Sequence, residues 1–138
     1  MPAERVEARA SDVRHRLLLA LGATALAALL LLAPTGRLGQ IPLASLAHVP
    51  LFAVLVVVWM RALAALGLHG WRAVGLCVGA GVVFAAGSEL AQAWIPGRWP
   101  GVGDLMRNLL GLAIGLALCP VLARPPSRRG RRPDGPSG

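Results

Sequence analysis

Four long apolar stretches, separated by short polar or turn-forming segments, dominate the chain. They cover residues 17–33, 45–66, 73–94 and 104–122. The hydrocarbon core of a bilayer is about 30 Å thick and needs roughly 17 to 25 mostly apolar residues per helix, so each stretch is long enough to cross a membrane. The pattern predicts an all-α integral membrane protein. Because the joins are short, we expect a four-helix antiparallel bundle.

These spans leave no room for a separate soluble domain. Of the 138 residues, 56% are hydrophobic, which is more than a soluble domain usually carries. We expect residues 1–16 to form a charged cytoplasmic N-terminal segment, 17–122 the membrane domain, and 123–138 a disordered basic cytoplasmic tail with nothing to bury. The first span is longer than a usual signal-peptide core and lacks a small-x-small cleavage site, so we expect it to be retained.

The arginines predict the orientation. All 14 basic residues are arginines, and positive charge is retained on the cytoplasmic side of a membrane. With both termini in the cytoplasm, eleven arginines lie inside and only Arg37, Arg98 and Arg107 lie outside. The net charge of +8 then favours anionic lipid heads as partners, and we expect no nucleic acid because aromatic or fold support for it is absent.

The few polar side chains within the spans gather around the join between the last two, SELAQAWIPGRWPGVGDLMRNLLG (residues 88–111). A carboxylate near the middle of a bilayer costs about 2.5 to 3.5 kcal/mol on insertion scales, so such residues are expected to face one another and not lipid. The predicted topology brings the start of the second span to the same outer interface. We expect a pocket there, formed by six side chains: His48, Glu89, Gln92, Arg98, Asp104 and Asn108.

Each of these residues also has a purely structural interpretation. Glu89 fits an ion pair with Arg98 or Arg107, or a contact with a helix N-terminus, about as well as a ligand site. Asp104 is placed to cap the last span. For the two amide side chains the alternative is hydrogen bonding between helices, and a lone histidine at a helix start commonly meets water. The convergence of six polar groups favours a functional pocket.

Small residues predict how the last two spans pack. Gly111 and Gly115 form a G-x-x-x-G pattern that lets another helix approach closely, and small side chains also line the preceding span, at Gly81, Ala85 and Ala86. We expect these two faces to dock. The glycines also permit a homo-oligomer without requiring one.

Cys77 and Cys119 lie within spans and have no histidine or carboxylate at metal-ligand spacing. We therefore interpret them as small buried hydrophobic residues. No metal and no cofactor is expected.

Taken together, the polar positions resemble a known family. Glu89-x-x-Gln92, Pro96-Gly97-Arg98 and Asp104-x-x-x-Asn108-x-x-Gly111, preceded by His48, are similar to the VanZ-like family of small bacterial membrane proteins over about residues 45–118. The resemblance implies a four-helix, multi-pass protein of the bacterial inner membrane. It also implies a link to glycopeptide resistance, because the founding member is linked to low-level resistance to teicoplanin. It implies no settled reaction.

The leading functional hypothesis is a binding module in the outer leaflet that recognises an anionic lipid head group or a lipid-linked cell-wall precursor. Arg98 would bind phosphate, and Gln92 and Asn108 would orient polar groups. Membrane lipids and lipid-linked precursors are the expected partners.

Two alternatives remain open. The first is an intramembrane hydrolase or transferase acting on a lipid-linked substrate, with Glu89 or Asp104 as general base and His48 as acid. No activated nucleophile and no convincing metal triad are evident, so the sequence favours this alternative less than the binding module. The second is a proton-coupled small transporter with a relay from Glu89 to His48, for which four short spans leave little room.

Overall fold

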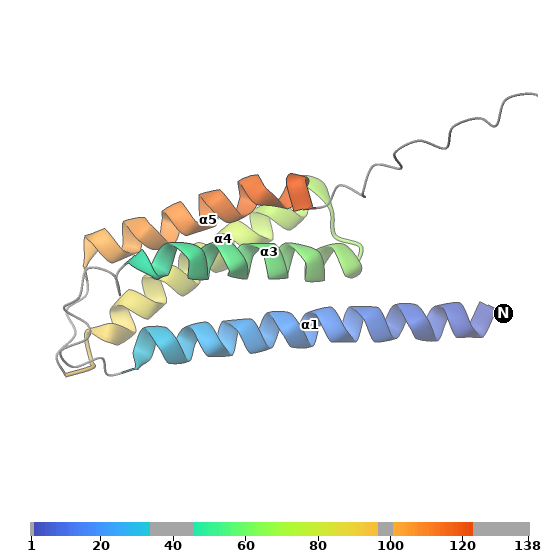
Figure 1. Cartoon of the computed structure of the whole chain (residues 1–138), viewed down its shortest axis with the longest axis horizontal. Coiled ribbons are helices and arrows are strands. Elements are labelled where there is room, and N and C mark those ends of the chain that lie inside the picture. Colours follow the sequence, from blue (N-terminus) through green and yellow to red (C-terminus); the bar gives the residue numbers. More distant parts are fainter. Residues whose placement is uncertain (1, 34–45, 97–100, 123–138) are drawn as a thin grey trace, which may run out of the picture.

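The computed structural model describes residues 2–33, 46–96 and 101–122, which form four helices (Figure 1). They are α1 (Pro2–Leu32), α3 (His48–Ala65), α4 (Gly70–Gln92) and α5 (Val102–Leu122). Each is long and apolar enough to cross a membrane, and the described ranges contain no strand. The prediction of an all-α membrane bundle with four spans is confirmed. The tail expected at 123–138 lies outside the described residues.

Successive helices run in opposite directions, so the bundle has two distinct ends. At one end lie the start of α1 and the end of α5, and we name it the terminal end (Figure 1). At the other end, the hairpin end, α4 finishes and α5 begins. The closest packing is between α3 and α5, α1 lies against α3, and α4 crosses the bundle obliquely.

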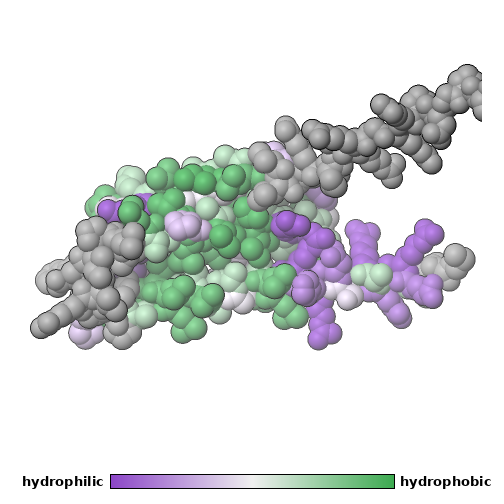
Figure 2. All heavy atoms as spheres, in the orientation of Figure 1, coloured by the Kyte–Doolittle hydropathy of each residue, from purple (hydrophilic) through white to green (hydrophobic). Residues whose placement is uncertain are grey.

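Helix α1 is longer than the membrane requires. Its 31 residues make a helix of about 46 Å, whereas the hydrocarbon core is about 30 Å thick. Its first half carries charged side chains, including an ion pair between Arg16 and Asp12 with nitrogen and oxygen 2.9 Å apart. Figure 2 shows this hydrophilic segment projecting beyond the apolar body of the bundle. The charged residues before the first span therefore continue its helix.

Helices α3 and α4 are joined by a glycine-based turn at the terminal end. The N–H of Gly67 donates to the carbonyl of Ala64, and that of Leu68 donates to the carbonyl of Leu63, at 3.0 and 2.9 Å. This pair of bonds is the Schellman motif, which satisfies the last carbonyls of a helix. It requires a left-handed residue after the helix, and Gly67 supplies it with φ of 85°. The chain can therefore reverse within four residues.

The G-x-x-x-G pattern of α5 lies against α3. A Cβ atom at Gly111 would come within 2.5 Å of the Val49 carbonyl oxygen, and one at Gly115 within 2.7 Å of that of Ala53. The expectation that these glycines dock on the small residues of α4 is therefore wrong. They let the α3 backbone approach α5 instead, because glycine adds no side chain between the two helices.

Helix α4 meets α5 at the position after Gly111. Leu112 reaches towards Gly81 of α4, where a Cβ atom would come within 2.5 Å of the Leu112 side chain. Ala85 is buried, as expected for a packing position, whereas Ala86 is exposed. Neighbouring faces of α5, about 100° apart at Gly111 and Leu112, thus contact α3 and α4.

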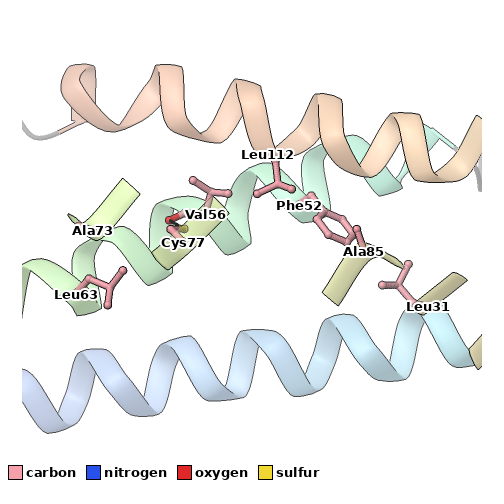
Figure 3. Packing of buried hydrophobic residues seen from close by; sticks show 8 residues of the cluster. All are labelled: Leu31, Phe52, Val56, Leu63, Ala73, Cys77, Ala85 and Leu112. Atoms are coloured by element: carbon pink, nitrogen blue, oxygen red, sulfur yellow. Dashed lines mark hydrogen bonds between the residues drawn. The ribbon is translucent and has the colours of Figure 1, made fainter. Parts of the chain in front are cut away.

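The interior of the bundle holds a cluster of apolar side chains in which every helix takes part (Figure 3). Phe52 of α3 packs on Phe84 of α4, with ring centroids 5.8 Å apart. Helix α1 contributes Leu31 to this cluster. A hydrogen bond also ties α1 to α3, because the Trp59 indole N–H donates to the Thr24 hydroxyl at 2.9 Å.

The described arginines are distributed unevenly between the two ends. Arg61 and Arg72 flank the turn at the terminal end, where the arginines of α1 also lie, while the hairpin end carries Arg107. Arg37, Arg98 and the arginines of the tail fall outside the described ranges. This asymmetry is the one that the positive-inside rule uses to orient a bundle.

The close approach at Gly111 yields a stability prediction. Replacing it by alanine should lower the free energy of unfolding by about 1 to 3 kcal/mol, because the added methyl group overlaps the α3 backbone. Reversible unfolding in mixed detergent micelles, followed by circular dichroism, measures this. Gly79→Ala is the matched control, because a Cβ atom there meets nothing within 4 Å. Equal stability of the two variants would contradict the packing described here.

Candidate functional site

Asn108 lies at the centre of a buried polar network at the hairpin end. Its side chain is fully buried, with 0% exposure. The amide nitrogen donates to Glu89 Oε1 at 3.4 Å, and the amide oxygen lies 2.9 Å from His48 Nδ1. Since that oxygen can only accept, the network assigns the proton to Nδ1 of His48. One side chain of α5 thus joins α3 and α4.

Glu89 receives a second hydrogen bond from the start of α5. The backbone N–H of Gly101 donates to Oε2 at 3.2 Å, and the carbonyl of Gly101 accepts from Asp104 and Leu105 in the first turn of the helix. The carboxylate therefore lies at the positive end of the α5 dipole, which favours a negative charge. Of the partners expected for Glu89, the described residues supply the helix N-terminus.

Gln92 follows Glu89 by one turn on the same face of α4. Its side chain is only 2% exposed. Its amide nitrogen Nε2 is buried without a hydrogen-bond partner, and no other side-chain nitrogen or oxygen of the described residues is in that position. An unsatisfied buried donor costs about 1 to 3 kcal/mol. Such a group is explained when a bound molecule supplies the acceptor.

We name His48, Glu89, Gln92 and Asn108 the polar cluster. These four of the six expected site residues are buried at the hairpin end, and three of them share the hydrogen-bonded chain. Asp104 is partly exposed and pairs with Arg107 one turn further along α5. Helix α5 begins at Val102, so Asp104 lies in the first turn instead of at the N-cap. Arg98 lies outside the described residues.

The amide of Asn108 separates the two titratable groups of the cluster. His48 and Glu89 each contact Asn108, whose amide orients them but neither gains nor loses a proton at neutral pH. Ser88, the neighbour of Glu89, donates its hydroxyl to the Ala85 carbonyl at 2.8 Å and so bonds within its own helix. Hydrogen bonding is therefore the main chemistry that the cluster offers.

The described residues hold no group of three His, Cys, Asp or Glu side chains placed to bind a metal ion. Both cysteines are free, and Cys77 is buried among apolar neighbours. Cys119 lies close to the Gly115 carbonyl on its own helix, at 3.2 Å.

Sequence reasoning missed the hydrogen bond between Thr24 and Trp59, since a hydroxyl in the first span and an indole in the second do not reveal which helices are neighbours. It predicted a helix N-terminus as one possible partner of Glu89, but it did not identify Gly101 as the residue whose N–H donates.

Comparisons with known proteins identify one family. The family model described as VanZ/LLP1 matches residues 8–123, which include all four helices and the whole polar cluster. Neither the curated proteins nor the solved structures contain a match.

The network predicts a measurable coupling between His48 and Asn108. In a double-mutant cycle with His48→Ala and Asn108→Ala, the coupling energy should be about 0.6 to 1.7 kcal/mol, as for other hydrogen bonds between membrane helices. Reversible unfolding in detergent micelles gives the free energy of unfolding of the wild type, the two single variants and the double variant. Ser88→Ala serves as the control and should show no coupling with Asn108→Ala. Strictly additive effects of the first pair would rule out the bond.

Proposed function

The chain belongs to the VanZ/LLP1 family and is a multi-pass membrane protein, and on that premise we propose that its polar cluster binds the head group of a lipid. The ligand is an anionic membrane lipid or a lipid-linked cell-wall precursor. The observation that carries the proposal is the buried Nε2 donor of Gln92, which has no acceptor among the described residues. A phosphate or carbonyl oxygen of a head group supplies one.

The donors around this position suit an anionic group. Gln92 offers an amide N–H, and the start of α5 adds the positive end of a helix dipole. Arg98, which the sequence places in the loop between Gln92 and Gly101, would add a guanidinium able to bind phosphate in bidentate fashion. Glu89 already accepts two hydrogen bonds from the protein, so its role in this proposal is to hold Asn108 and Gly101 in place.

The cluster belongs, in this proposal, to the outer leaflet of a bacterial inner membrane. Both termini lie in the cytoplasm because the terminal end of the described bundle carries most of its arginines. A site at the hairpin end then meets head groups on the outer side. Tolerance of glycopeptides such as teicoplanin would follow from changed access to cell-wall precursors or to the membrane.

One observation favours an enzyme as the second candidate. His48 Nδ1 is held by Asn108, which leaves Nε2 without a hydrogen-bond partner among the described residues. A histidine oriented in this way suits general acid or base catalysis on a lipid-linked substrate. Release of phosphate from a lipid phosphate by the purified protein, lost in Glu89→Gln, would place this candidate first.

If the polar cluster binds a lipid head group, the purified protein should carry a bound lipid of defined mass. In native mass spectrometry of protein extracted with its membrane lipids, we expect the wild type to retain one lipid, and Gln92→Leu and Arg98→Ala to retain about tenfold less. Phosphatidylglycerol and a polyprenyl phosphate, added separately, identify which class restores the adduct.

The matched control for that experiment is Ser88→Ala, which alters a buried polar residue beside Glu89 whose hydroxyl bonds only within its own helix. It should keep the adduct. Retention of the lipid by all four proteins alike would remove the support for a head-group site.

Orientation is tested with one cysteine at each end of the bundle. Pro96 follows α4 at the hairpin end and His69 precedes α4 at the terminal end, and both are exposed. In a background with Cys77→Ala and Cys119→Ala, a membrane-impermeant maleimide applied to intact cells should label Pro96→Cys and leave His69→Cys unlabelled. The reverse pattern would place the polar cluster at the cytoplasmic face and exclude an outer-leaflet site.

A further inference from the structure

A second feature of the bundle lies next to the polar cluster. A cavity of about 380 Å³ is enclosed mainly by α3 and α4, with one side chain each from α1 and α5. Its wall includes Phe52, Trp59 and Leu63 of α3 and Leu76 and Ala80 of α4. Figure 3 shows several of its lining side chains, among them Phe52, Val56 and Leu112, directed into the interior between the helices.

Among the described residues, the wall of this cavity offers no free polar side chain. The Trp59 indole N–H is bonded to the Thr24 hydroxyl, and that hydroxyl donates to the Ala20 carbonyl at 2.8 Å. The thiol of Cys77 lies 4.0 Å from the Val56 carbonyl oxygen. The remaining lining side chains are apolar. Water needs two to four polar partners to occupy a cavity, so this one takes an apolar guest.

The volume of the cavity limits what it can hold. Along α3 it extends from Phe52 to Leu63, which is about 16 Å of helix. A helix segment of that length and 10 Å in diameter occupies about 1,300 Å³, whereas the cavity has a volume of about 380 Å³. A helix from a second copy or from a partner protein does not fit. An extended hydrocarbon chain does.

The cavity also reaches the surface that faces lipid. Leu76, at 55% exposure, and Ala80, also exposed, form part of its wall on α4. Helices that cross the membrane are surrounded by acyl chains at this depth. A chain can therefore enter sideways from the bilayer, and it gains dispersion contacts that an empty cavity would lack.

One end of the cavity adjoins the polar cluster. Phe52 follows His48 by one turn of α3, and Leu112 follows Asn108 by one turn of α5. We propose that the cavity holds one unbranched acyl chain of a phospholipid whose head group lies at the polar cluster. This inference rests on the proposed function and narrows it. The small volume favours a phospholipid chain over the bulkier polyprenyl chain, which carries a methyl branch on every isoprene unit.

Trp59 is a built-in reporter for this chain. In a variant with Trp71→Phe, Trp94→Phe and Trp99→Phe, Trp59 is the remaining indole. Bromine atoms quench indole fluorescence on contact, so the probe is phosphatidylglycerol with dibrominated acyl chains, titrated into the protein in detergent micelles. We expect quenching that saturates at about one lipid per protein.

Two variants fill the mouth of the cavity. Ala80→Phe and Leu76→Phe each place a ring at an exposed lining position, and each should weaken the quenching affinity by about tenfold. The matched control is Ala113→Phe. Ala113 is exposed on α5 beside Leu112 and does not line the cavity, so the affinity should change by less than about twofold. The proposal is overturned if quenching never saturates, or if neither Ala80→Phe nor Leu76→Phe changes the affinity obtained from it.

Two further arms separate the inference from the proposed function. Competition by unlabelled phosphatidylglycerol that is stronger than competition by a polyprenyl phosphate supports the acyl chain, and the opposite order overturns it. Gln92→Leu tests the head group alone. If it leaves the affinity unchanged while the filling variants still weaken it, the chain site stands and the head-group site fails.

Discussion

The arrangement of this bundle depends on one amide side chain. Asn108 is fully buried, and it meets an imidazole from α3 and a carboxylate from α4. In a membrane those groups have no water to bond, so each needs a protein partner. The contact is possible only because Gly111 and Gly115 bring the α3 backbone up to α5. The glycines that allow close packing and the asparagine that bonds the polar groups therefore lie on neighbouring turns of α5.

The polar cluster and the apolar cavity together resemble the two halves of a lipid. The cluster lies at the hairpin end, where the carboxylate of Glu89 sits at the start of α5, and the cavity begins one helical turn deeper, at Phe52 and Leu112. Hydrogen bonding serves a head group and dispersion serves a chain. Under the two proposals, a four-helix protein would hold the head group and one chain of the same lipid.

Much of this could be predicted from the sequence. The four spans follow from uncharged runs of membrane length, and the gathering of His48, Glu89 and Asn108 follows from the rule that polar groups avoid lipid. The helix that packs on Gly111 and Gly115 could not be predicted, because a G-x-x-x-G pattern identifies the packing face of one helix and not the helix that covers it. The start of α1 at Pro2 was also hidden, since hydropathy marks where a span enters the membrane and not where its helix begins. The structure of the segment holding Arg98 lies outside the described residues, and its role stays a prediction.

The most direct test of the central contact is solid-state nuclear magnetic resonance in lipid bilayers. With ¹⁵N in histidine and ¹³C in asparagine, a through-space correlation between His48 Nδ1 and the side-chain carbonyl carbon of Asn108 reports their hydrogen bond. The account predicts this correlation in the wild type and its loss in Asn108→Ala. A wild-type spectrum without it, in which His48 exchanges protons with water as readily as His15 and His69, would contradict the account.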